Sequence, residues 1–171
     1  MPRNNIKLRP LASTILIVLI GSVLHFIYGW LGQWQPIGII AAINESVWEH
    51  TKLAFIPLLI YWLLLIIKLH NNHRWTNAAI GGLIAIITAI FLIPAIYYIL
   101  KFGFDLDNLY LNIANFFFSI LLGQIIGSHI FKRCAPSPLF GILCILLILL
   151  IFAFYIYVTF NPFNFPIFIS A

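Results

Sequence analysis

Long apolar runs constrain this chain more than any motif does. A bilayer core about 30 Å thick is crossed by roughly 20 residues of helix, because each residue rises about 1.5 Å, and five runs of the sequence reach that length. Charged residues make up only 8% of the 171 residues, too few to coat a soluble globule. The sequence therefore predicts an all-α, polytopic membrane helix bundle with five transmembrane helices.

We expect a single integral membrane domain over residues 1–171. The predicted spans are 11–30, 46–69, 76–100, 109–131 and 139–160. The apolar run at 36–43 is too short to cross, so we expect a re-entrant or interfacial segment there. Pro57 and Pro94 are expected to kink the second and third helices and to leave carbonyl groups free in the outer half of the bundle. A cavity that opens outward follows from those kinks.

Lysine and arginine are distributed unevenly over the predicted loops. Seven of the nine fall on one side of the membrane, namely Arg3, Lys7, Arg9, Lys68, Arg74, Lys132 and Arg133. Cytoplasmic loops carry this excess, so we expect the N-terminus inside, the C-terminus outside and a multi-pass protein of the cell membrane. The net charge of +5 suits anionic lipid headgroups, and we expect the lipid bilayer, with no nucleic acid, as a partner.

All four carboxylates fall on the predicted outer side, two of them in one short polar motif. This motif reads Asn44-Glu45-Ser46-Val47-Trp48-Glu49-His50-Thr51-Lys52. Carboxylates and imidazoles are the usual general acids and bases, so Glu45, Glu49 and His50 are the candidate catalytic residues. The candidate substrate-binding residues are Asn44, Ser46, Trp48, Lys52, Asn112 and Asn115.

A purely structural interpretation of the motif stands beside the catalytic one. Ser46 and Glu49 have the spacing of a capping box, in which the serine hydroxyl accepts from the backbone near Glu49 and the glutamate reaches back to the serine amide. Lys52 is then an i,i+3 ion-pair partner of Glu49, and Trp48 an interfacial anchor. Adjacent residues differ by about 100° around a helix, so Glu49 and His50 share one spot only if the helix begins irregularly.

His25 lies about one and a half turns below the predicted outer end of the first helix, where an ionisable side chain is expected to face the bundle. Together with Glu49 and His50 it forms the candidate metal-ligand set. Such ligands suit a divalent metal such as zinc, and three of them with an open position are what metal-assisted hydrolysis needs. The His-Glu-x-x-His signature of metalloproteases is absent from the sequence.

The fourth predicted helix carries a polar stripe on one face. Asn112, Asn115 and Ser119 continue into Gly123 and Gly127 in steps close to one helical turn. The asparagines are expected to line a polar cavity, and the glycines to form a close-packing seam. On the predicted inner side, the histidines at 70, 73 and 129 are expected to be solvated loop residues.

The stretch from His25-Phe26-x-Tyr28 through Asn44-Glu45-Ser46-Val47-Trp48-Glu49-His50-x-Lys52 to Pro57 resembles the signature of a family of small bacterial integral membrane proteins, a domain of unknown function found largely in Firmicutes. The resemblance implies a multi-helix membrane protein from a bacterium of that kind. It supplies no activity.

Three classes of function remain open. The first is an outward-facing, metal-dependent hydrolase that acts on a lipid or cell-envelope substrate, with Glu45 as the alternative general base and Asn112 or Asn115 as an orienting donor. The second is an ion-coupled transporter or carrier, which the absence of any acidic residue from the inner half weakens. The third is a non-catalytic membrane component that docks a partner. The sequence leaves the substrate and the oligomeric state open.

Overall fold

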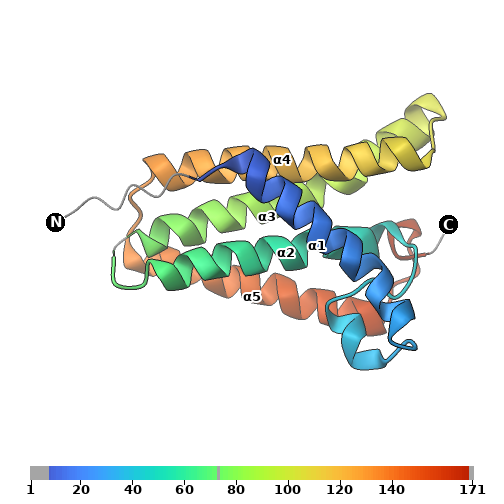
Figure 1. Ribbon diagram of the computed structural model, residues 1–171, viewed down its shortest axis with the longest axis horizontal. Helices are drawn as coiled ribbons and strands as arrows, with labels where there is room; N and C mark the ends of the chain where they lie inside the picture. The colour runs from blue at the N-terminus through green and yellow to red at the C-terminus, as the bar shows by residue number, and fades with distance from the viewer. Residues whose placement is uncertain (1–7, 73, 170–171) are drawn as a thin grey trace.

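The computed structural model describes residues 8–72 and 74–169, and every regular element within these ranges is a helix (Figure 1). In chain order the elements are α1 (Pro10–Trp30), η1 (Gln35–Ile39), α2 (Val47–Lys68), α3 (Trp75–Tyr98), η2 (Ile99–Gly103), α4 (Leu109–Arg133), α5 (Pro138–Phe160) and η3 (Pro166–Phe168). Of the short elements, η1 and η3 are 3-10 helices and η2 is π-helical. Arg3, Lys7 and His73, which entered the predictions above, lie outside the described residues.

Five helices are long and apolar enough to cross a membrane, which confirms the prediction of an all-helical chain with five spans. They are Pro10–Trp30, Val47–Lys68, Trp75–Gly103, Leu109–Arg133 and Pro138–Phe160. The third span is longer than predicted because η2 continues α3 without a break. The architecture is that of a multi-pass membrane protein.

Local sequence decides where several of the helices begin. The side chains of Ser46, Asn108 and Ser137 each accept a hydrogen bond from a backbone N–H in the first turn of α2, α4 and α5. Pro10 and Pro138 occupy the first turns of α1 and α5, where a missing N–H costs nothing. These signals lie in the sequence, so the predicted and observed starts agree closely.

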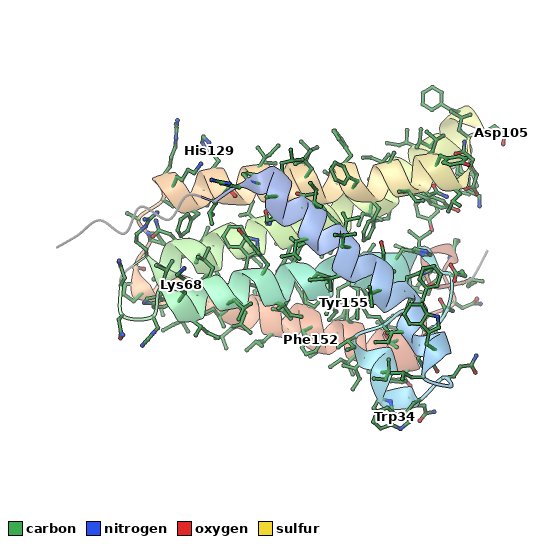
Figure 2. The ribbon with its side chains drawn as sticks, viewed as in Figure 1. Trp34, Lys68, Asp105, His129, Phe152 and Tyr155 are labelled. Atoms are coloured by element: carbon green, nitrogen blue, oxygen red, sulfur yellow. The ribbon has the colours of Figure 1, made fainter. Side chains whose placement is uncertain are left out.

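Four helices run side by side along the long axis, and α1 crosses them diagonally (Figure 1). Figure 2 shows Lys68 and His129 at one end of the bundle and Asp105 and Trp34 at the other. The first end holds the C-termini of α2 and α4, and we call it the basic end. The second holds η1, η2 and η3, and we call it the acidic end.

Glycines bring α3 and α4 into close contact, as the sequence predicted. A Cβ atom on Gly123 would lie 2.5 Å from the carbonyl oxygen of Ala85, and one on Gly127 would clash with the carbonyl oxygen of Gly81. Only a residue without a side chain fits at such a backbone approach. The seam fixes the relative position of α3 and α4, which extend to the tip of the bundle at the acidic end (Figure 1).

The polar part of the same α4 stripe contributes to the contact between α3 and α4. Asn115 is buried and donates to the backbone oxygen of Ile93, 2.8 Å away, while its own oxygen accepts from Ser119. The α4 stripe therefore ties α4 to α3 beside Pro94. Pro57 acts differently: it cannot donate to the carbonyl of Leu53, and Gly21 of α1 packs against that oxygen, where a Cβ atom would lie only 2.9 Å away.

Candidate functional site

The C-terminal end of α1 and the segment that leads into α2 together form the candidate site. His25 lies on the last turns of α1, Glu45 just before the N-cap Ser46, and His50 in the first turn of α2. Ser46 accepts from the backbone N–H of Glu49 at 3.3 Å, and its own N–H donates to the side chain of Asn44 at 2.9 Å. These two hydrogen bonds fix the backbone on which Glu45 and His50 are carried.

His25, Glu45 and His50 converge on one another. Nε2 of His25 lies 3.8 Å from one carboxylate oxygen of Glu45, and Nε2 of His50 lies 3.6 Å from the other. One ligand atom from each of the three residues can be chosen so that all lie within 4.8 Å of one another. The side chains are 25%, 67% and 37% exposed in that order, so the cluster opens toward its surroundings through Glu45.

The His50 ring is held in one orientation by the backbone. Its Nδ1 lies 2.9 Å from the carbonyl oxygen of Ser46. A carbonyl only accepts, so Nδ1 carries a proton and, in the neutral ring, Nε2 presents its lone pair toward Glu45. Metal-binding histidines commonly have this arrangement, in which the second ring nitrogen donates to a backbone carbonyl.

The His25 ring is oriented by neighbouring rings. It packs edge-on against Phe26, with centroids 4.8 Å apart, and its centroid lies 5.3 Å from that of His50. Its Nδ1 is buried and has no hydrogen-bond partner within the described part of the chain. Within the described part of the chain, Nε2, which faces Glu45, is therefore the ring nitrogen available for a polar contact.

Glu49 does not join the two histidines, although the sequence placed it in their ligand set. Its carboxylate turns inward and lies 2.6 Å from the ammonium of Lys52, and both side chains are almost fully buried. It also accepts from the backbone of Ile43 at 3.0 Å and from Thr159 of α5 at 3.1 Å. The expected i,i+3 ion pair thus forms, and adjacent Glu49 and His50 face different ways because a helix turns by about 100° per residue.

The capping box is only half formed. Ser46 caps α2 as predicted, but the reciprocal half of the prediction is wrong, since Glu49 binds the N–H of Ile43 and not that of Ser46. The reason lies in tertiary structure. Lys52 and Thr159 hold the carboxylate toward the interior, and the side-chain oxygen of Asn44 accepts from the serine amide.

Two of the predicted substrate-binding residues, Lys52 and Trp48, make contacts within the bundle. Lys52 donates to the backbone oxygen of Gly38 at 2.7 Å and to Thr159 at 2.9 Å. Trp48 stacks on Tyr155 with centroids 4.4 Å apart. Both side chains therefore join the start of α2 to α5, whose Tyr155 is seen inside the bundle in Figure 2.

The two asparagines of α4 form hydrogen bonds with partners other than the histidines. Asn115 binds α3, as described above, and Asn112 donates to Asp107 at 3.2 Å. Asp107 also accepts from Lys101, whose Nζ is 2.9 Å away, and this hydrogen bond is the main cause that holds the pKa of the Asp107 carboxyl below its usual range. Lys101 donates in addition to the hydroxyl of Tyr97 at 2.9 Å.

A pocket of about 310 Å³ adjoins the candidate site and shares Glu45 with it. The other walls come from the end of α3, from η2 and from the C-terminal segment, and they include Tyr97, Tyr98, Lys101, Phe102 and Ile169. These residues belong to no motif of the sequence. The only signal was the i,i+4 spacing of Tyr97 and Lys101, which is common in any helix.

The described histidines at the basic end, His70 and His129, belong to no group of three ligand-type side chains. His70 is exposed and its Nδ1 lies 2.9 Å from the backbone oxygen of Ile67. Within the described ranges, His25, Glu45 and His50 are the one group of three ligand-type side chains close enough to share a metal ion.

The chain matches the family of unknown function DUF6512 over residues 4–171. It belongs to that family, and the predicted resemblance to a family of unknown function is confirmed, while the bacterial origin stays a prediction. No curated protein and no solved structure matches the chain. A function must therefore follow from the chemistry of the site.

Proposed function

We propose that this member of the DUF6512 family is a metal-dependent hydrolase that acts on a lipid or cell-envelope substrate at the outer face of the cell membrane. His25, Glu45 and His50 would hold a divalent ion such as zinc. The observation that carries the proposal is the convergence of these three ligand-type side chains from two helices and a loop. Glu45 replaces Glu49 in the ligand set that the sequence suggested.

The distances within the cluster are longer than those of an occupied metal site but close enough for the three side chains to converge on one ion. Zinc lies about 2.0–2.2 Å from nitrogen and oxygen ligands, so the ligand atoms of a tetrahedral site are about 3.3–3.5 Å apart. The nitrogen to oxygen distances of 3.8 and 3.6 Å to Glu45 are slightly longer than this, and slightly long for direct hydrogen bonds. With one ligand atom from each residue the separations reach up to 4.8 Å, so the three side chains would have to rotate inward when a metal ion binds.

The surroundings of the cluster support the same assignment. The hydrogen bond from His50 to the Ser46 carbonyl leaves Nε2 as the ligand atom. The buried pair of Glu49 and Lys52 fixes the loop from Gly38 to Ile43, and with it the position of Glu45. Three protein ligands leave a coordination position open, and a zinc ion bound there would supply a Lewis acid and activate a water molecule for hydrolysis.

The proposed orientation follows from the charges at the two ends of the bundle. Lys68, Lys132 and Arg133 lie at helix ends of the basic end, which we assign to the cytoplasm, with the N-terminus inside. The candidate site and the C-terminal segment then lie outside. An ion-coupled carrier is less well supported, because within the described chain no acidic side chain lies in the inner half of the bundle to continue a path.

Metal analysis of the purified protein tests the proposal. The wild type, stripped with a chelator and reloaded, is expected to bind one zinc ion per chain. His25→Ala, Glu45→Gln and His50→Ala should each weaken binding by more than about 100-fold, since even the loss of an outer-shell partner costs about 10-fold to 100-fold. His70→Ala is the matched control and should bind zinc normally.

The catalytic part of the proposal has its own assay. Zinc-loaded protein in detergent should hydrolyse a short-chain fluorogenic ester or phosphodiester lipid, and the Glu45→Gln variant should not. A wild type that binds no zinc, or that binds it equally well after all three substitutions, would overturn the metal site. A zinc-loaded wild type without activity on any lipid ester or phosphodiester would overturn the hydrolase.

A further inference from the structure

The pocket beside Glu45 lies at the acidic end, between three parts of the chain that are distant in sequence. Its walls come from residues 45 and 47, from the end of α3 with η2, and from the C-terminal segment around η3. Figure 1 shows the outer tip of α3 and α4 and the C-terminal segment at the same end of the bundle. Glu45 belongs both to this pocket and to the histidine cluster, so a molecule in the pocket lies next to the proposed metal ion.

Most of the pocket wall is aromatic or aliphatic. Tyr98 and Phe102 stack with their centroids 5.8 Å apart and their planes 10° apart, and Ile169 contributes from the C-terminal segment. Phe102 is 75% exposed, and its neighbour Phe104 is exposed as well. Large exposed apolar side chains at the end of a membrane span are in place to contact acyl chains, so the wall suits an amphipathic ligand taken from the membrane.

One cation lies in this largely apolar wall. The ammonium of Lys101 is held by the hydroxyl of Tyr97 and the carboxylate of Asp107. An ammonium has three donors, and these two contacts, within the described part of the chain, leave one for a ligand. A lysine ammonium binds phosphate as a point charge. The other charged side chain of the wall, Glu45, is a carboxylate, so an anionic group is expected at Lys101 and away from Glu45.

We propose that this pocket binds an anionic phospholipid, with the headgroup phosphate at Lys101 and the acyl chains along Tyr98, Phe102 and Ile169. The substrate of the proposed hydrolase is then a phospholipid-like amphiphile; this last step rests on the proposed function, whereas lipid binding does not. A soluble phosphate compound fits less well, because it leaves the apolar wall uncovered. A zwitterionic lipid carries its own cation and gains less from Lys101.

Native mass spectrometry of the full-length protein in detergent tests the proposal. The probes are dioleoylphosphatidylglycerol, dioleoylphosphatidylcholine and glycerol 3-phosphate. We expect phosphatidylglycerol to bind about tenfold more tightly than phosphatidylcholine, since one charge-assisted hydrogen bond accounts for a difference of that order. Glycerol 3-phosphate should not bind at the same concentration. Equal binding of the two lipids, or binding of the soluble phosphate alone, would overturn the proposal.

Substitutions in the pocket test which side chains cause the preference for phosphatidylglycerol over phosphatidylcholine. Lys101→Gln should lose the preference for phosphatidylglycerol, and Lys101→Arg should keep it. Lys68→Gln, an exposed lysine of the basic end, is the matched control and should behave as wild type. Phe102→Ala should weaken binding of both lipids, whereas Phe91→Ala, an equally exposed phenylalanine in the middle of α3, should not.

A further variant is expected to gain affinity for the lipid, a result that loss of folding cannot produce. Asp107→Asn removes the carboxylate that competes for Lys101 and is expected to raise the affinity for phosphatidylglycerol several-fold. An unchanged or lower affinity in this variant would count against an anion site at Lys101. Zinc content measured on the same samples separates the two proposals: lipid selectivity without zinc overturns only the hydrolase, and zinc without lipid selectivity overturns only the phospholipid site.

Discussion

The carboxylate of Glu49 and the ammonium of Lys52 lie 2.6 Å apart and are shielded from the surroundings. Four residues before Glu49, Glu45 is exposed and faces two histidines. The two carboxylates of the motif therefore lie in different surroundings. Glu49 fixes the loop and the start of α2, and Glu45 is left to act in the candidate site.

The first prediction concerns this buried pair. Glu49→Gln leaves the charge of Lys52 buried without its partner, and the loss of one member of such a pair lowers the free energy of unfolding by about 3–5 kcal/mol. The double variant Glu49→Gln/Lys52→Met should recover most of that loss, because no charge is then left buried. Denaturation in detergent micelles measures both. Glu49→Gln with wild-type stability would contradict a structural role for the pair.

A second prediction concerns the seam between α3 and α4. Gly127→Ala places a methyl group against the backbone oxygen of Gly81 and should lower the free energy of unfolding by about 1–3 kcal/mol. Gly29→Ala is the matched control, since a Cβ atom there has no heavy atom within 4 Å and alanine favours a helix more than glycine does. Thermal unfolding of the two variants provides the comparison. Equal changes in the two variants would mean that the close approach of α3 and α4 at Gly127 does not contribute to the free energy of unfolding.

The third prediction concerns pH. The pKa of Asp107 is lowered in the folded protein, chiefly by the hydrogen bond from Lys101. The contact therefore stabilises the folded state above the unfolded pKa of about 4, and this contribution is lost as the pH falls through the lower folded-state pKa. The melting temperature of Asp107→Asn should lie below that of the wild type at pH 7 and approach it in acid. Asp105→Asn, which leaves the Lys101 contact intact, is the control, and a gap for Asp107→Asn that persists unchanged at pH 2 would refute the assignment.

The fourth prediction concerns orientation. In a background without Cys134 and Cys144, an impermeant maleimide added outside the cell should label Asp105→Cys and spare Asn71→Cys, because the two loops lie at opposite ends of the bundle. Labelling of both after the membrane is permeabilised serves as the control. Labelling of position 71 in intact cells would reverse the proposed orientation and place the candidate site inside.

Local signals made much of the architecture predictable. Apolar runs of spanning length indicate the five helices, because no other backbone conformation satisfies its own hydrogen bonds in lipid except a closed barrel. Ser46 marks the start of α2, and the i,i+3 spacing of Glu49 and Lys52 predicts their ion pair. Each of these features depends on residues within one or two helical turns of each other.

The identity of the carboxylate beside the histidines was not predictable in the same way. Glu45 lies in a segment that is neither helix nor strand, so no periodicity indicates its direction. Its position follows from contacts across the fold, such as those of Lys52 with Gly38 and of Glu49 with Ile43. The pocket at Lys101 depends likewise on Pro166 and Ile169 of the C-terminal segment, 65 and 68 residues later in the chain.

The sequence by itself thus determined the five spans, the unequal charge of the two ends, the cap of α2 and the glycine seam, because each depends on local periodicity or composition. Only the tertiary structure decided that Glu45 and not Glu49 meets His25 and His50, and that Asn115 serves the contact between α3 and α4. The physical reason is that a buried carboxylate or amide in a membrane protein takes the orientation in which it finds hydrogen-bond donors, acceptors or an opposite charge. For Glu49 one of those partners, Thr159, lies 110 residues along the chain.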